Sequence, residues 1–250
     1  MVYLLYRLKF PAGIHIGANA SLEATSLTVS SDIFYSAFYS EYVKIFGDSD
    51  KELLELTEKD EFKVSDLLPF KKMETETAFY LPKPAANDIE RKQNDEQTVD
   101  RKKLKKINYI RASRLKEYFE FLKTWGNFSE DNDFGEKELH IKNNISRTGE
   151  DPELYNIEVF KFNKNTGLYV IVQLPEEWKE KFENVLESLS LTGIGGKKNA
   201  GYGQFNVAGE ALTLDGKYFD IIESEDDKFI NESLYKESEK YLLLSSYLPQ

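Results

Sequence analysis

The segment from Leu191 to Phe205, LTGIGGKKNAGYGQF, contains five glycines and two adjacent lysines. Glycine loses more conformational freedom on folding than any other residue. Such a cluster therefore indicates backbone that turns at positive φ or approaches another group closely. Residues 175–193 before it repeat large apolar side chains at helical spacing, and residues 202–208 after it have the pattern of a strand. The segment predicts a loop that leaves the C-terminal end of a helix and enters a strand.

This loop differs from the two common phosphate-binding loops of proteins. A P-loop requires glycine five residues before its Gly-Lys pair and Ser or Thr after it, but Leu191 and Lys198 stand there. The dinucleotide fingerprint GxGxxG also fails, because Gly193 and Gly195 are followed three residues later by Lys198. Both motifs lead into the positive N-terminal end of a helix, whereas this loop follows a negative C-terminal end. Attraction for an anion must therefore come from glycine N–H groups and from the two lysines.

Two interpretations of the loop are open at this point. In the first, single-stranded nucleic acid lies against it. Each phosphate neutralised by Lys197 or Lys198 then contributes about −0.7 to the salt slope of binding, and Tyr202 stacks on a base. In the second, the glycines form only a tight helix-to-strand turn, and Tyr202 belongs to the core.

Composition and charge limit the function classes. The chain has 250 residues and a formal net charge of −11, so a polyanion must bind to a local basic site. Cysteine is absent and the histidines are His15 and His140, which excludes a disulfide scaffold and a structural zinc site. No membrane span or secretory signal is recognised, so we expect a cytoplasmic location. The basic cluster Arg101–Lys106 either contacts RNA, meets a neighbouring subunit or is only solvated.

Hydrophobic periodicity predicts the elements of the N-terminal half. In chain order they are a strand (2–10), a helix (30–47), a short helix (51–60), the two strands of a hairpin (62–70 and 75–84) and a helix (113–125). The first strand buries its even-numbered face, and the first helix has a serine cap and ends at Gly47. A polar insertion is expected around 85–150, mobile over 85–106.

The C-terminal half continues this alternation. Its predicted elements are a hairpin (156–174) turned at NKNTG with Gly167 in a left-handed conformation, a helix (175–193), a strand (202–208) and a buried strand (241–250). The overall order is strand, helix, hairpin, insertion, hairpin, helix, strand. This order predicts an α+β chain with a ferredoxin-like (RRM-like) sheet and insertions.

Several segments carry a resemblance to a known family. TGIGGKKNAGYGQF (192–205) is similar to the pattern G-x-G-G-[KR]-x-x-G-x-G-x-F of the glycine-rich loop in the RAMP superfamily of CRISPR proteins. LKFPAGIHIGA (8–18) and SSDIFYSAF (30–38) resemble the first strand and helix of the RAMP subunit that caps the crRNA 5′ end in type III-A (Csm) effector complexes. AFYLPKP (78–84) and KNNISRTGEDPELYNIEVFKF (142–162) resemble further segments of that subunit.

The resemblance implies a role in RNA binding. It implies an RRM-like core that binds the repeat-derived 5′ handle of crRNA and contacts the large polymerase-like subunit and the backbone RAMP subunit. It implies no catalytic activity, cofactor or metal. The candidate RNA-binding residues are Gly193, Gly195, Gly196, Lys197, Lys198, Asn199, Gly201, Tyr202 and Gly203 in the loop, with Arg147 and His15 beside it. A surface ion pair for Arg147 and a turn-stabilising hydrogen bond for His15 are the alternatives.

The resemblance also suggests a domain division. Residues 1–210 are expected to form the RRM-like RAMP domain, and residues 211–250 a linker and the start of a possible second RRM-like half. Members usually carry that second half. Its apparent absence is interpreted as truncation, a short family member or a separate chain.

A catalytic alternative is also open. Some RAMP proteins cleave crRNA precursors by general acid and base chemistry. His15 would serve in such an endoribonuclease, with Tyr202, Lys197 or His140 as its partner. A sugar- or nucleotide-processing enzyme of another fold is disfavoured, because the sequence pairs no nucleophile with a base and no acidic pair has metal-ligand spacing.

Overall fold

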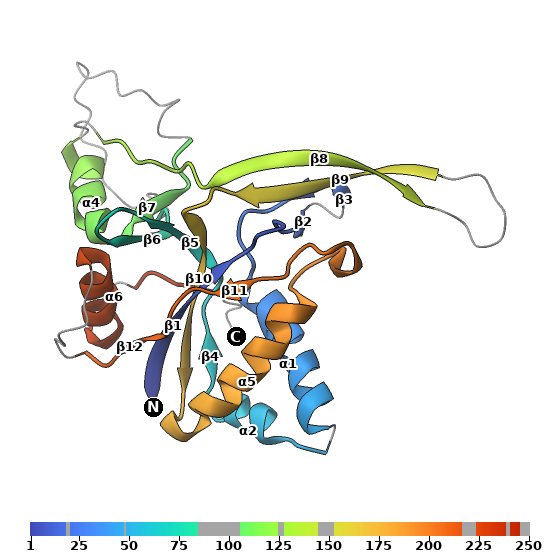
Figure 1. The fold of residues 1–250 in the computed structure, drawn as a ribbon. Helices are drawn as coiled ribbons and strands as arrows, with labels where there is room; N and C mark the ends of the chain where they lie inside the picture. The colour runs from blue at the N-terminus through green and yellow to red at the C-terminus, as the bar shows by residue number, and fades with distance from the viewer. Residues whose placement is uncertain are drawn as a thin grey trace.

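The computed structural model describes residues 1–18, 21–47, 49–84, 106–124, 128–144, 153–216, 224–238 and 241–245. Its main sheet contains β1 (Val2–Lys9), β4 (Lys63–Val64), β5 (Leu68–Lys72), β6 (Thr77–Pro82), β7 (Tyr109–Arg111), β10 (Thr166–Leu174), β11 (Asn206–Val207) and β12 (Leu212–Leu214). The strands lie antiparallel in the order β11, β1, β10, β5, β6, β7, with β12 paired to β1 and β4 paired to β10 (Figure 1).

Two helices make the connections that define the fold. Helix α1 (Ser31–Phe46) lies between β1 and β5 in the chain, and helix α5 (Lys179–Thr192) lies between β10 and β11. In space β10 separates β1 from β5, and β1 separates β10 from β11. This interleaving is the split β-α-β arrangement of a ferredoxin-like unit. The predicted α+β class is confirmed, and the strand order agrees with the expected ferredoxin-like arrangement.

Each of the four predicted helical regions matches an observed helical segment, with ends that agree within one or two residues. The remaining helical elements are α2 (Glu52–Glu58), η1 (Ala112–Arg114), α4 (Leu115–Thr124), η2 (Glu176–Trp178), η3 (Lys198–Ala200) and α6 (Glu225–Tyr235). Helix α1 follows its N-cap Ser30 and ends at Gly47, whose φ of 84° allows its N–H to reach the carbonyl of Val43. Helix α6 had no counterpart in the sequence prediction, because its acidic first turn hides a short apolar face.

Both faces of the sheet are buried. The even-numbered side chains Leu4, Tyr6 and Leu8 of β1 join the aromatic cluster under α1 and α5, as predicted. The opposite face, which includes Leu5, packs against α4 and α6. Helices therefore cover each face of the central strand (Figure 1).

The predicted hairpin over residues 156–174 is wrong. Strand β9 (Glu153–Phe162) pairs along its whole length with β8 (Gly135–Asn144), and this two-stranded ribbon projects from the body (Figure 1). Strand β10 cannot accept β9 as a neighbour, because β1 and β5 already occupy its two edges. Beside the base of the ribbon lies a small hairpin of β2 (Gly17–Ala18) and β3 (Ser21–Thr25). We call β8 and β9 together the ribbon.

Gly167 also differs from the prediction. It lies in extended strand β10 and not in a left-handed turn. A Cβ added there would lie 2.4 Å from the carbonyl oxygen of Leu8 on the neighbouring strand. Close approach of two backbones explains this glycine better than turn geometry does.

The C-terminal segment contains a second correction. Residues 241–245 form no strand, and Tyr241 and Leu243 are exposed, although Leu242 and Leu244 contact the cluster near α4 and α6. The predicted buried strand is therefore wrong over these residues, since no neighbouring strand pairs with them, and 246–250 lie outside the described residues. The division at residue 210 stays a prediction.

Helix α6 is attached to the sheet by a buried carboxylate. Asp226 accepts hydrogen bonds from the N–H groups of Phe79 and Ser113 and from Nε of Arg111. It is fully buried, so these three donors replace the water that its charge would otherwise bind. The bonds hold α6 against β6 and β7 on the face of the sheet opposite α1 and α5.

Candidate functional site

The glycine loop, defined as residues 193–205, leaves α5 with several residues at positive φ. Gly193, Gly195, Gly201 and Gly203 have φ between 82° and 90°, and Lys197 has φ of 57°. Most L-residues avoid this region, so the glycines supply conformations that other side chains would make costly. The predicted passage from a helix C-terminus into a strand is confirmed.

Residues on either side of the tip of this loop are hydrogen-bonded to the turn that follows β1. The N–H of Gly203 donates to Gly13 O at 2.9 Å, and the N–H of Gly196 donates to His15 O at 2.8 Å. Within the loop, Ile194 N–H donates to Gly203 O at 2.9 Å. A Cβ on Gly203 would lie only 2.0 Å from Ile194 O. We call these residues, which lie on both sides of the tip, the anchored end of the loop. A side chain has no space there.

The middle of the loop faces solvent. Residues 198–200 form the short η3 turn with Lys198, Asn199 and Ala200 exposed. A Cβ added at Gly201 would meet no atom within 4 Å. We call this solvent-facing tip, residues 197–201, the open end of the loop. Its backbone and the Lys198 side chain are accessible to a ligand.

His15 is a buried support of the glycine loop. Its side-chain Nδ1 lies 2.7 Å from Glu158 O, and because a carbonyl only accepts, Nδ1 carries the proton. The ring also lies beside Gly196, where an added Cβ would be 2.8 Å from Cδ2 of His15. His15 therefore joins the turn after β1, the ribbon and the loop. Its burial favours the structural alternative over direct RNA contact.

Tyr202 is buried between the loop and the ribbon. Its ring packs with Ile157 and Val159, and its hydroxyl donates to Nδ1 of His140 at 3.1 Å. The other His140 nitrogen, Nε2, lies 2.8 Å from the Glu138 carboxylate and donates to it. With its ring 5% exposed, Tyr202 does not present a face on which a base can stack. Of the two interpretations of Tyr202, its burial supports the packing role, because the ribbon covers the ring.

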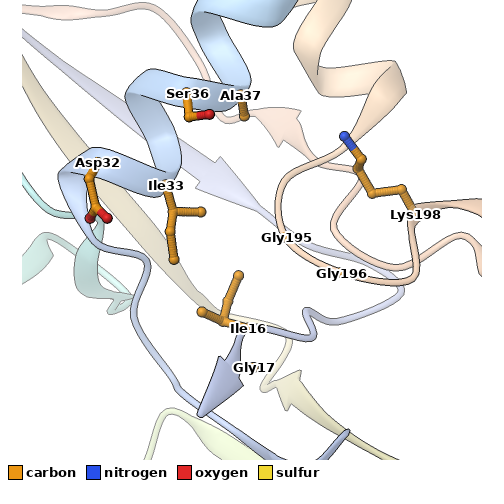
Figure 2. Close-up of a pocket in the computed structure, with 9 residues that line it drawn as sticks. All are labelled: Ile16, Gly17, Asp32, Ile33, Ser36, Ala37, Gly195, Gly196 and Lys198. Carbon is orange, nitrogen blue, oxygen red and sulfur yellow. The ribbon is translucent and has the colours of Figure 1, made fainter. Parts of the chain in front are cut away.

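The two adjacent lysines have different surroundings. Lys197 Nζ lies 4.5 Å from the ring centroid of Tyr155 on the ribbon, a distance typical of a cation–π contact. Lys198 is exposed and borders a surface depression. The Lys198 side chain extends from the loop into the space beside it (Figure 2).

The depression lies between α1, the turn after β1 and the glycine loop, and has a volume of about 460 Å³. Ile16, Gly17, Asp32, Ile33, Ser36, Ala37, Gly195, Gly196 and Lys198 line it. Figure 2 shows the α1 side chains on one wall and the loop with Lys198 on the other. The sequence prediction identified the loop wall but missed the α1 wall. The residues of the α1 wall lie in the SSDIFYSAF segment, which the sequence analysis interpreted only as the start of a helix.

Asp32 places negative charge on the α1 wall. A hydrogen bond from the Ser30 side chain, followed by the backbone N–H groups of Asp32 and Ile33, lowers the pKa of this carboxyl below its usual value, so it stays ionised at neutral pH. The carboxylate thus occupies the first turn of α1 and complements the positive end of the helix. The depression has a cationic wall and an anionic wall.

Some predicted residues lie outside this description. Arg147 and residues 101–105 of the basic cluster are outside the described residues. Within the described residues, no group of three His, Cys, Asp or Glu side chains is arranged to hold a metal ion. Across the same part of the chain, no helix is long and apolar enough to cross a membrane.

The sequence of this chain is similar to the sequences of known proteins. The chain is 27% identical over 222 residues to "CRISPR system Cms protein Csm4" of Streptococcus thermophilus, covering 86% of this chain and 67% of the relative. It is 22% identical to the protein of the same name from Methanocaldococcus jannaschii, covering 92% of this chain and 71% of that relative.

Solved structures share the fold. A chain of the Csm3-Csm4 subcomplex in the type III-A CRISPR-Cas interference complex matches with a TM-score of 0.52 and 19% identity, over 90% of this chain and 74% of that chain. A chain of the Csm1-Csm4 cassette in complex with AMPPNP matches with a TM-score of 0.53 and 16% identity, over 86% and 72%. Finally, the sequence profile of the RAMP superfamily matches residues 42–206, which is more than half of the chain. This chain belongs to the RAMP superfamily.

Proposed function

We propose that this chain is a non-catalytic, RNA-binding subunit of a type III-A CRISPR (Csm) effector complex. It anchors the 5′ handle of crRNA at the open end of the glycine loop and links a large polymerase-like subunit to backbone RAMP subunits. The observation that carries the proposal is the anchored loop, which presents the exposed residues 198–200, with the Lys198 side chain, beside the 460 Å³ depression. The names of the similar proteins and complexes support the choice of assembly.

The physical basis is local attraction in an acidic protein. A net charge of −11 disfavours binding of RNA over the whole surface, so the few cations at the loop decide where phosphate binds. Lys198 supplies a mobile ammonium group, and the glycines allow the sugar-phosphate backbone to approach main-chain N–H groups closely. One neutralised phosphate gives a small salt slope, so partner subunits contribute much of the affinity.

The buried state of His15 argues against the endoribonuclease alternative. Its Nδ1 proton is donated to Glu158 O, and the ring is 3% exposed. A general acid or base must come within about 2.6–3.2 Å of the atom that it protonates or deprotonates, or act through one water. Of the three partners considered for His15, Tyr202 and His140 bond to each other, and Lys197 Nζ lies over the Tyr155 ring.

The test is RNA binding by the assembled complex. The chain is co-expressed with its two proposed neighbours, the RNA that co-purifies is sequenced, and binding of the labelled handle is followed by fluorescence anisotropy between low and moderate salt. Lys198→Ala should reduce the slope of log affinity against log salt by about 0.7, the share of one phosphate on a single strand. Lys197→Ala should change the slope much less, since its ammonium is held against Tyr155.

Two controls make the test decisive. Lys116→Ala on α4 removes an exposed lysine on the other side of the sheet, and the slope should not change. An assembled complex that retains no handle RNA would contradict the proposal. Handle cleavage that disappears in His15→Ala would favour the endoribonuclease instead.

A further inference from the structure

We propose that the depression between α1 and the glycine loop holds one nucleotide of the bound RNA, and that Asp32 selects guanine there by accepting hydrogen bonds from the base. This inference rests on the proposed function and assigns a base preference to the same site. It starts from the α1 wall, which the sequence pattern did not identify as part of the site.

The size and lining of the depression suit a nucleotide. Its volume of about 460 Å³ falls in the range of small-molecule sites. Ile16, Ile33 and Ala37 give an apolar floor on which the flat face of a base can lie. Polar groups occur at the two ends of this floor, with Lys198 on the loop and Asp32 on α1 (Figure 2).

The charges fix the orientation of the nucleotide. The N-terminal end of a helix usually attracts phosphate, but at α1 the ionised Asp32 carboxylate already stands in the first turn. A phosphate would be repelled at that wall and attracted at the loop wall by Lys198. The sugar-phosphate therefore lies on the loop wall beside Lys198, and the base extends toward α1.

The α1 wall then determines which base fits. An ionised carboxylate only accepts hydrogen bonds, and its two oxygens can take about four of them, so Asp32 can accept two from one base. Guanine offers two adjacent donors on its Watson–Crick edge, N1–H and the N2 amino group. Adenine, cytosine and uracil each offer one donor group on that edge.

Ser36 strengthens the match to guanine. It follows Asp32 by four residues, so the two side chains lie on the same face of α1, and both line the depression. A serine hydroxyl can donate to the O6 acceptor that stands next to N1–H of guanine. Asp32 and Ser36 together thus complement a donor, donor, acceptor edge.

The experiment changes the hydrogen-bonding groups of one guanine at a time. The handle RNA identified by co-purification is synthesised with each guanine replaced singly by inosine, which lacks the N2 amino group, and by adenine. The wild-type complex should lose about tenfold in affinity at one position only, as expected for loss of a paired base contact. Asp32→Asn should abolish the difference between guanine and adenine at that position and leave the other positions unchanged.

Two further variants protect the interpretation. Ser36→Ala leaves the helix start intact and should also weaken the preference for guanine, so a folding defect of Asp32→Asn would not hide the result. Glu120→Gln on the exposed face of α4 is the matched control and should keep the full preference.

The outcomes separate this inference from the proposed function. If the wild-type complex binds no handle RNA, the proposed function fails. If it binds the handle but shows no guanine-dependent position, or if Asp32→Asn and Ser36→Ala keep the wild-type preference, only the base assignment fails. A handle without guanine would also overturn the assignment.

Discussion

The anchored end and the open end of the glycine loop contain the same residue type for different reasons. At the anchored end, Gly203 has positive φ and no room for a Cβ, and its backbone bonds to the turn after β1. At the open end, Gly201 also has positive φ but faces empty space. Glycine content alone therefore does not indicate a binding site. At the open end, packing within the fold does not explain the glycine, and this is the part of the loop that we propose for RNA.

The largest expected effect is the loss of folding stability in Gly203→Ala. The alanine would combine strain at a φ of 82° with an overlap against Ile194 O, and the two terms together should cost about 2–5 kcal/mol. Gly201→Ala is the matched control, with strain but no overlap, and should cost about 1–2 kcal/mol. Urea unfolding of the two variants measures the difference.

Equal losses in these two variants would break the comparison. That result would mean that conformational strain dominates at both ends and that the anchored end tolerates a methyl group. The functional readout then adds a second contrast. Gly203→Ala should also weaken RNA binding by displacing the loop, while Gly201→Ala should retain the salt slope of the wild type.

A smaller effect is expected from Tyr202→Phe, which tests how the ribbon holds the anchored end. The change removes the hydroxyl that donates to His140 and keeps the ring between Ile157 and Val159. Loss of one such bond should reduce the free energy of unfolding by about 1 kcal/mol. Tyr241→Phe removes only a long, exposed hydrogen bond from Ser238 N–H, at 3.4 Å, and should change it by much less. A Tyr202→Phe protein as stable as the wild type would show that the ring alone joins loop and ribbon.

The smallest expected effect separates the adjacent lysines at the boundary between the two ends. A double-mutant cycle of Lys197→Ala and Tyr155→Ala should give a coupling energy of about 0.5–1 kcal/mol in unfolding experiments, the size of a cation–π contact at a partly exposed site. The same cycle with Lys198→Ala should be additive. Coupling of Tyr155 to Lys198 in place of Lys197 would reverse the roles that we assign to the two lysines.

Local patterns predicted most of the fold. The repeat of Phe34, Phe38 and Tyr42 marks α1, and Trp178 and Phe182 mark η2 and α5, because helical periodicity is written into neighbouring residues. The sequence pattern did not predict the ribbon, because the prediction depended on a visible buried face. Its strand β8 carries a mixture of charges with Leu139 and Ile141 exposed, so no buried face appears in the pattern.

The candidate site was predicted only in part. The glycines and Lys198 could be found from the loop sequence, but Asp32 and Ser36 looked like ordinary residues of a helix start. They become part of the site because α1 packs beside the loop on the same face of the sheet. The sequence left base stacking and core packing of Tyr202 both open, because its partner His140 lies 62 positions away in the chain.

By itself, the sequence determined the four predicted helices, strands β1, β5 and β6, the order of these elements, and the position of a glycine-rich turn between α5 and the next strand. These features depend on φ preferences and on periodicities that span a few residues. Only the tertiary structure decided that Lys197 packs against Tyr155, that His15 supports Gly196, and that a depression opens beside Lys198. Those outcomes depend on contacts between segments far apart in the chain, and no local pattern encodes them.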